Sequence, residues 1–278
     1  MKTAFINGDY FPLSEAKISI FDRGLLFGDG IYEVLPVYNG QVFFLDRHLK
    51  RLESNLDKIK IPMPNCDWQN MITQLITQNG SGDLQVYIQI TRGDQGQRKH
   101  DIPSSLKPTL FAFTIHNKYP TLEEKLRGLK AKLLEDIRWL RCDIKSTSLL
   151  GNILLNDEAV STGFQTSILM RDNQVTEGST TNVFIVTQDG TIKTPPLNHL
   201  CLPGITREIA VELIQQLGWP LLEESFSCEE LFAAKEVWAA STTKEIFPIT
   251  QIDDKQIADG QAGAYWLKIN ELYNNLKN

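Results

Sequence analysis

The chain has few cysteines and no long apolar run, and both absences narrow the class of protein. Its four cysteines are far apart and include no Cys-x-x-Cys pair, so neither a zinc ribbon nor a disulfide framework is expected. No apolar run reaches the roughly 18 residues that span a bilayer, and no signal-like apolar region follows Met1. These absences predict a cytoplasmic protein with reduced thiols, no membrane segment and no metal site.

Basic residues form no long block in this sequence. The 278 residues include 28 Lys and Arg against 34 Asp and Glu, and the net charge is -6. A nucleic-acid partner or a membrane surface therefore has little support. The apolar share of 42% is ordinary for a globular protein, and the length suits one large or two medium domains.

Short-range patterns predict hairpins, a helix and a strand. Dipeptides that favour the positive φ values of tight hairpin turns stand beside apolar runs at Asn7-Gly8, Asn39-Gly40 and Asp189-Gly190. From Leu45 to Ile59 apolar residues recur in steps of four and three, which is typical of one helical face, and Pro62 follows. Residues 84–91 alternate between apolar and polar, which predicts a strand with one buried face.

The remaining patterns mix helices and strands without a strict alternation. A helix is expected to begin at Leu149, immediately after Lys145, and another covers residues 209–217, ahead of Gly218. The expected class is therefore α+β, or mixed α/β. The polar stretch 116–121 predicts a linker.

The linker divides the chain into two expected domains. An amino-terminal α+β domain is predicted at 1–117, a linker at 118–121 and a carboxyl-terminal domain at 122–278. The second domain would contain Lys145.

Lys145 and Glu177 stand in two distinctive local settings. Most lysines and glutamates are solvated surface groups, but Glu177 lies between the apolar runs 168–170 and 183–186, in a stretch rich in Thr, Ser and Gly. A carboxylate beside buried strands needs a cationic or hydrogen-bonding partner. An amine for a Schiff base and an acid for a pyridine nitrogen together suggest pyridoxal 5'-phosphate (PLP) as a cofactor.

Three places in the sequence could hold a phosphate. Gly204-Ile205-Thr206-Arg207 precedes the helix 209–217, so backbone N–H groups and the Thr206 hydroxyl would converge there, although a simple capped helix start is an equal interpretation. Ser241 and Thr242 follow an apolar strand and could also be capping residues. Arg51 lies at the edge of the first helical face, where it could bind phosphate, form a salt bridge or reach water.

Another set of residues suits a substrate carboxylate. Arg98, Lys99 and His100 form a basic run in a loop, which could equally be a solvated charged loop. Tyr32 is either a packing aromatic or a phenol directed at substrate. His48, on the first predicted helix, is interpreted as a packed or hydrogen-bonded histidine.

With these residues assembled, the chain resembles the class IV, or fold-type IV, PLP-dependent aminotransferases. Within them it is most similar to the bacterial D-amino acid (D-alanine) aminotransferases. The resemblance covers nearly the whole length and is strongest at 22–24, 28–33, 136–146, 149–152 and 176–178. It implies a two-domain fold of that type and PLP as the cofactor.

The resemblance also implies roles for individual residues. Lys145 would form the Schiff base and move the proton, Glu177 would pair with the pyridine nitrogen, and Leu202 would pack on the ring. The phosphate would be held by Arg51, Ile205, Thr206, Ser241 and Thr242. The substrate carboxylate would be bound by Tyr32, Arg98 and His100, the last two from the partner subunit of a homodimer.

The implied reaction is ping-pong transfer of the amino group of a D-amino acid, such as D-alanine, to a 2-oxo acid, such as 2-oxoglutarate. Three alternatives stay open. Two are enzymes of the same fold, a branched-chain L-amino acid aminotransferase and an aminodeoxychorismate-lyase-like enzyme. The third is a non-catalytic protein that only binds the cofactor.

Overall fold

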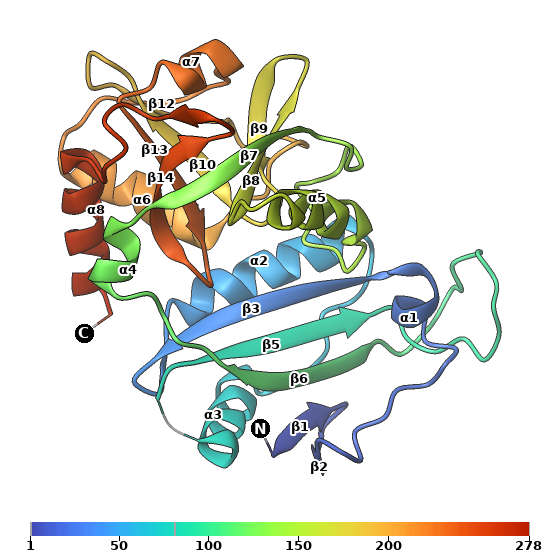
Figure 1. The fold of residues 1–278 in the computed structure, drawn as a ribbon. Helices are drawn as coiled ribbons and strands as arrows, with labels where there is room; N and C mark the ends of the chain where they lie inside the picture. The colour runs from blue at the N-terminus through green and yellow to red at the C-terminus, as the bar shows by residue number, and fades with distance from the viewer. Residues whose placement is uncertain (1, 81, 278) are drawn as a thin grey trace. The chain divides into compact units, whose positions relative to one another are not determined.

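The computed structural model describes residues 2–80 and 82–277, which form two compact units (Figure 1). Unit 1 comprises the described residues up to Lys118 together with Ile144–Leu149, and unit 2 comprises Tyr119–Asp143 and the described residues from Leu150 onward. The change from unit 1 to unit 2 at Lys118 falls in the predicted linker.

The segment Ile144–Leu149 differs from the sequence-based division, which assigned Lys145 to the carboxyl-terminal domain. In the structure this segment groups with unit 1. The reason is backbone pairing that no local pattern reveals: the N–H of Tyr32 donates to the carbonyl of Lys145 at 3.1 Å, and the N–H of Thr147 donates to the carbonyl of Gly30 at 3.0 Å.

Unit 1 is built on a six-stranded antiparallel sheet with the order β2-β1-β6-β5-β3-β4. Its strands are β1 (Thr3–Ile6), β2 (Asp9–Pro12), β3 (Gly30–Tyr38), β4 (Gln41–Val42), β5 (Leu84–Thr91) and β6 (Thr109–His116). Its helices are α1 (Arg23–Phe27), α2 (Leu45–Lys58) and α3 (Trp68–Asn79).

The local predictions for unit 1 are confirmed. The turns at Asn7 (φ 52) and Asn39 (φ 50) join antiparallel neighbours, as the positive φ values of Asn-Gly require. The predicted strand 84–91 matches β5, and the predicted helical face belongs to α2.

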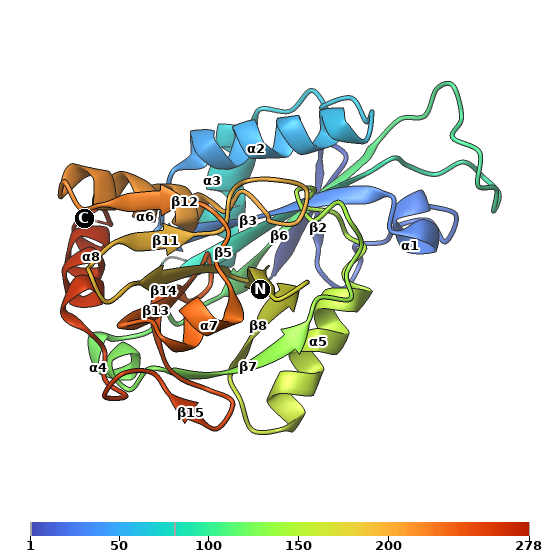
Figure 2. The same cartoon turned by 90° about the horizontal axis from the view of Figure 1, so that it is seen from above.

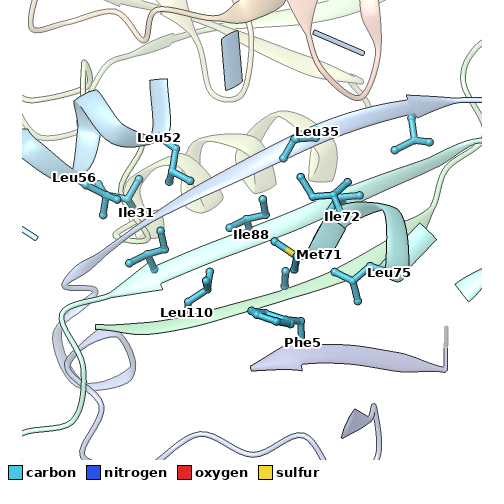
Figure 3. Close-up of a cluster of buried hydrophobic side chains, with 14 of the residues drawn as sticks. Phe5, Ile31, Leu35, Leu52, Leu56, Met71, Ile72, Leu75, Ile88 and Leu110 are labelled. Atoms are coloured by element: carbon cyan, nitrogen blue, oxygen red, sulfur yellow. The ribbon is translucent and has the colours of Figure 1, made fainter. Parts of the chain in front are cut away.

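One face of the unit 1 sheet is covered by α2 and α3 (Figure 2). In Figure 3, Leu52 and Leu56 of α2 and Met71 of α3 lie over apolar side chains of the strands, such as Leu35. Because successive strand residues point to opposite faces, Tyr32 and its sheet neighbours face the side that these helices do not cover. That second face is where the aromatic residues of the candidate site lie.

Unit 2 is built on a nine-stranded mixed sheet with the order β12-β11-β10-β13-β14-β7-β8-β9, and β15 pairs with β14. Its strands are β7 (Leu129–Glu135), β8 (Thr166–Arg171), β9 (Gln174–Gly178), β10 (Asn182–Val186), β11 (Ile192–Thr194), β12 (Leu221–Glu223), β13 (Glu236–Ser241), β14 (Glu245–Ile252) and β15 (Lys255–Gln256). Its helices are α4 (Leu122–Leu126), α5 (Leu150–Ser161), α6 (Ile205–Gln216), α7 (Cys228–Phe232) and α8 (Ala264–Asn275).

Helices pack on this sheet in two groups. In unit 2, α6 and α8 contact each other and the central strands β13 and β14, whereas α5 contacts β7 and β8 (Figure 1). The hairpin predicted at Asp189-Gly190 joins the antiparallel pair β10 and β11 and is confirmed, as are the predicted helices α5 and α6.

The apolar residues from which the sequence predicted α5 do not form a buried stripe within unit 2. Leu155 and Ala159 are buried, but Leu150 is 70% exposed, Ile153 59% and Leu154 52%. A contiguous apolar surface of this kind marks a site of association more often than a free surface. Within residues 2–80 and 82–277, no helix combines the length and apolar character needed to cross a bilayer.

Candidate functional site

Glu177 lies on β9 of unit 2 and is held in an unusually complete set of hydrogen bonds. Its side chain is 4% exposed and accepts from Arg138 Nη1 at 2.5 Å, from the Leu202 backbone N–H at 3.0 Å and from Asn182 Nδ2 at 3.4 Å. Arg138 in turn binds Asp136 through Nε and Nη2, at 2.9 and 2.8 Å. A buried charge row, Asp136–Arg138–Glu177, thus fixes the orientation of the Glu177 carboxylate.

The electrostatics of this row are dominated by burial. Burial raises the pKa of Glu177 above its ordinary value, although Arg138 and the Leu202 N–H oppose part of that rise. Burial is the largest single effect on Asp136 and raises its pKa. Hydrogen bonds from Arg138 and Thr176, together with the charge of Arg138, outweigh burial, so the pKa of Asp136 is lowered. Glu177 is therefore a carboxylate that gains from a further positive partner, such as a protonated ring nitrogen.

Asn182 connects Glu177 to the turn that leads into α6. Besides contacting Glu177, its Nδ2 donates to the Leu202 carbonyl at 2.9 Å. A Cβ on Gly204 would lie 2.1 Å from Asn182 Oδ1, so no larger residue fits there without displacing the amide. The turn 202–204 and the carboxylate are therefore positioned by the same side chain.

The amino terminus of α6 has open donors, as a phosphate site requires. Its N-cap is Gly204, and among the described residues no side chain caps the first turn. Ile205 and Thr206 are 5% exposed, and in the described part of the chain the Thr206 hydroxyl makes no hydrogen bond. The interpretation of Thr206 as a merely local capping group is thus not supported. The backbone N–H groups of Ile205 and Thr206, at the start of the helix, suit an anion.

Ser241 and Thr242 lie at the β13–β14 hairpin, and α6 packs against β13. Ser241 Oγ accepts from the Lys244 backbone N–H at 3.2 Å, which is the local role that the sequence left open. In the loop between β9 and β10, the hydroxyls of Ser179 and Thr181 are buried without a partner in the described residues. Unit 2 therefore offers donors and one carboxylate that fit the ring nitrogen and phosphate of PLP.

Lys145 belongs to unit 1, where both its backbone N–H and its carbonyl are hydrogen bonded. Its N–H donates to Asn55 Oδ1 of α2 at 2.8 Å, and its carbonyl accepts from Tyr32. The Nζ atom lies 4.2 Å from the centroid of the Tyr32 ring, and no carboxylate of the described part of unit 1 pairs with it. Lys145 is thus an amine with a fixed backbone and no permanent counter-ion in its unit.

Arg51 is 8% exposed and forms a forked ion pair with Glu33 of β3. Its Nε and Nη2 donate to the two Glu33 oxygens at 2.7 and 2.8 Å, and His48 Nδ1 lies 2.9 Å from Glu33 Oε2. Burial alone would raise the pKa of Glu33, but the charges and hydrogen bonds of Arg51 and His48 lower it by more, so the pKa lies well below its ordinary value. His48 is buried and hydrogen bonded to Glu33, as interpreted from the sequence, and this burial lowers its pKa.

This ion pair bears on the phosphate role that the sequence suggested for Arg51. The salt-bridge alternative is present in the structure, and the phosphate role stays a prediction. Since the fork is held rigidly, Arg51 keeps one orientation at little entropic cost.

Tyr32 heads an aromatic row on the open face of the unit 1 sheet. Its ring stacks on Tyr87 with centroids 5.7 Å apart, and Tyr87 stacks on Phe113 at 4.9 Å. Burial raises the pKa of Tyr87 to about 12. Tyr32 therefore packs as an aromatic, and its ring also contacts the amine of Lys145. Its role towards a substrate stays a prediction.

The loop that carries Arg98 and His100 folds against α1. Phe27 contacts both side chains, with the Arg98 guanidinium 5.4 Å and the His100 ring 5.3 Å from its centroid. Arg23 donates to the carbonyls of Lys99 and His100 at 2.8 and 3.3 Å. The loop is thus tied down at its backbone while Arg98 and His100 stay exposed.

Sequence reasoning missed several residues that position the site. Asn55 holds the backbone of Lys145, Glu33 holds Arg51, and Arg138 and Asn182 hold Glu177. Glu33, Arg138 and Asn182 occur in or beside the segments that carried the family resemblance. Only their long-range hydrogen bonds reveal what they do.

Comparison with known proteins identifies the family. The family described as amino-transferase class IV matches residues 30–252. A D-alanine aminotransferase of Staphylococcus haemolyticus is 37% identical over 279 residues, covering 99% of this chain and 97% of that protein. The D-alanine aminotransferase of Staphylococcus epidermidis is 39% identical, covering 95% and 93%.

Solved structures agree on the fold. A branched-chain amino acid aminotransferase from Escherichia coli superposes with a TM-score of 0.92 at 24% identity, covering 100% of this chain and 95% of that one. A branched-chain aminotransferase from Thermoproteus uzoniensis gives 0.88 at 28% identity, covering 98% and 93%. The expected mixed α/β class with a fold-type IV architecture is confirmed, and the chain belongs to the class IV aminotransferases.

Proposed function

We propose that this protein is a PLP-dependent transaminase that moves the amino group of a D-amino acid, D-alanine in the first instance, to a 2-oxo acid such as 2-oxoglutarate. The relatives named D-alanine aminotransferase align over nearly the whole chain at 37% to 39% identity. That likeness is the observation that carries the proposal. The proposed reaction is of the ping-pong type.

PLP, when bound, supplies an electrophilic aldehyde and a ring that accepts electrons. We assign the covalent link to Lys145 Nζ, which lies beside Tyr32 and has no carboxylate partner in the described part of its unit. With the cofactor and substrate bound, the Lys145 amine would take the proton from the substrate α-carbon and would deliver it to the C4′ carbon of the cofactor. The fixed backbone of Lys145 limits how far that amine can move.

Glu177 is assigned to the ring nitrogen. Its ionised form keeps that nitrogen protonated, and Arg138 holds the carboxylate in one orientation. Leu202, whose backbone N–H binds Glu177, is proposed to pack on the ring.

The phosphate is assigned to Ile205 and Thr206 at the amino terminus of α6, with Ser241 and Thr242 from the β13–β14 hairpin. The uncapped first turn supports this assignment, because backbone N–H groups there need an acceptor. Arg51 is proposed to add a positive charge, with its orientation set by Glu33.

Tyr32, Arg98 and His100 are proposed to bind the substrate carboxylate. Arg98 and His100 would act on a partner subunit of a homodimer, because both are exposed on a loop whose backbone Arg23 holds. Exposed apolar side chains support an association of subunits, among them Leu25 (68%), Ile137 (64%) and Leu150 (70%).

We also propose that the enzyme works in the cytoplasm. All four cysteines are free, which suits a reducing compartment.

The visible absorbance of the bound cofactor tests the function. Purified protein is titrated separately with D-alanine and with L-leucine, and the proposal expects loss of the visible band with D-alanine alone. Lys145→Ala should fold, by circular dichroism, and lose turnover. Full activity in that variant would refute the assigned role of Lys145.

A branched-chain L-amino acid aminotransferase is the second candidate. The observation that favours it is that the solved structures similar to this chain include a branched-chain aminotransferase at 28% identity. A response to L-leucine alone would establish this second candidate. No response to either amino acid, with release of 4-aminobenzoate from a chorismate-derived substrate, would establish the lyase.

A further inference from the structure

A buried ion cluster lies at the base of the β13–β14 hairpin in unit 2. Glu245, the first residue of β14, is 0% exposed, and its two carboxylate oxygens bind two lysines from distant segments. Lys125 of α4 donates to Oε2 at 2.5 Å, and Lys277, which follows α8, lies 2.5 Å from Oε1. Lys125 also donates to Asn270 of α8 at 2.7 Å.

The backbone of Glu245 is in a conformation that favours glycine. Its φ is +63°, and a residue with a Cβ in this left-handed region costs about 1 kcal/mol or more. Short hairpin loops commonly use glycine at such a position. A glutamate that is both buried and strained there indicates that its carboxylate is needed at the base of this loop.

The loop above the cluster carries the hydroxyls assigned to the phosphate. Ser241 pairs with Glu245 across the hairpin, and residues 242–244 form the connection. Within the loop, Ser241 Oγ accepts from the Lys244 backbone N–H at 3.2 Å. Because Glu245 pairs with Ser241, any motion of the Glu245 backbone therefore also moves Ser241 and Thr242.

We infer that Glu245, clamped by Lys125 and Lys277, is a positioning residue for the cofactor phosphate, and that Lys277 tunes the affinity for PLP from outside the site. The inference rests on the proposed assignment of Ser241 and Thr242 to the phosphate. The clamp holds the hairpin in the conformation that binds phosphate before the cofactor arrives. This reduces the ordering that binding would otherwise require.

Lys277 is the member of the cluster that can be changed with least damage to the fold. Its side chain is 16% exposed, whereas that of Lys125 is 2% exposed. Removing Lys277 leaves the pair Lys125–Glu245 intact, so no buried carboxylate loses all of its counter-ions. Removing Lys125 would also take away the hydrogen bond that the buried Asn270 side chain accepts at 2.7 Å, and would endanger folding.

The test compares four proteins: wild type, Lys277→Met, Lys277→Arg and the control Lys268→Met. Lys268 lies on α8, the helix that Lys277 follows, and pairs with Glu271 at the surface, with side chains 43% and 60% exposed. Two quantities are measured: the Kd of apoprotein for PLP, and hydrogen exchange of the Lys244 amide in apoprotein without any phosphate.

We expect Lys277→Met to raise the Kd for PLP by roughly tenfold, the lower end of the loss seen when a partner that orients ligating groups is removed. The Lys244 amide should exchange severalfold faster in the same variant. Lys277→Arg should restore both quantities towards wild type, and Lys268→Met should leave both unchanged.

Two outcomes would overturn the inference. Unchanged Kd and unchanged exchange in Lys277→Met would mean that the cluster does not position the loop. Faster exchange with an unchanged Kd would mean that the loop is clamped but does not hold the cofactor phosphate. The second outcome would refute the assignment of Ser241 and Thr242 to the phosphate. It would leave the proposed function untouched, because transaminase activity is measured separately.

Discussion

Replacing Arg138 with methionine should destabilise unit 2 by an amount that depends on pH. Arg138 is the principal counter-ion of Glu177, whose side chain is 4% exposed. Asp136 would keep hydrogen bonds from Thr176 at 2.9 Å and an ion pair with Arg171 at 3.5 Å. The loss therefore falls mainly on Glu177.

The magnitude follows from the cost of neutralising that carboxylate. A buried carboxylate without a counter-ion takes up a proton rather than staying charged. For a glutamate with an ordinary pKa of 4.5, protonation at pH 7 costs about 3.4 kcal/mol, since each pH unit corresponds to about 1.4 kcal/mol. Because burial already raises the pKa of Glu177 in wild type, we expect the Arg138→Met variant to lose up to about 3 kcal/mol of the free energy of unfolding at pH 7.

The sign of the pH dependence is fixed by the direction of the shift. Without Arg138 the pKa of Glu177 in the folded protein rises further above the value in the unfolded chain. Above the raised pKa that Glu177 has in folded wild type, the folded variant holds a proton that folded wild type has lost, so the variant becomes less stable relative to wild type as pH rises through that range. Between pH 7 and pH 5 the deficit should shrink by up to about 1.4 kcal/mol per pH unit.

Urea unfolding of apoprotein at pH 7 and pH 5 measures both quantities, at one protein concentration because association would shift the midpoint. Arg141→Met is the matched control, since Arg141 pairs with Asp143 near the surface, and its midpoint should equal that of wild type. A deficit that is the same at both pH values would refute the reasoning, because it would show that Glu177 does not titrate in response to the loss of Arg138.

Three further predictions concern the positioning residues. His48→Gln should remove an acid-sensitive part of the stability: because burial lowers the pKa of His48, wild type loses up to about 1.4 kcal/mol per pH unit below pH 6.5, and the variant should lack that slope in thermal unfolding. Gly204→Ala should force Asn182 away, since the new Cβ would lie 2.1 Å from its Oδ1, and we expect weaker PLP binding by fluorescence titration; affinity equal to wild type would contradict that packing. Asn55→Ala should lower kcat with little effect on KM in steady-state assays, because it frees the backbone of Lys145, the proposed Schiff-base residue. An effect on KM alone would argue against this role.

Local sequence signals predicted the elements that depend on neighbours in the chain. The spacing of apolar residues from Leu45 gave α2, because every third or fourth residue shares one helical face. Alternation at 84–91 gave β5, and Asn7-Gly8 gave a hairpin. These signals act over a few residues and do not require knowledge of partners.

The same signals could not reveal which distant residues meet. The apolar start of α5 is exposed in unit 2 rather than buried. Arg51 was weighed between phosphate, water and a salt bridge, and the choice of Glu33 as its partner depends on the register of β3 against α2. Such contacts arise from packing between elements, so periodicity within one element carries no information about them.

The sequence by itself indicated the family and the proposed cofactor, because the amine of Lys145 and the acid of Glu177 are the groups that the proposed roles at a Schiff base and a pyridine nitrogen require. Only the tertiary structure decided how those groups are held. Arg138 and Asn182 orient Glu177, and Asn55 fixes Lys145. Hydrogen bonds and ion pairs of this kind act over a few ångströms, and only the folded chain brings residues far apart in sequence within that range.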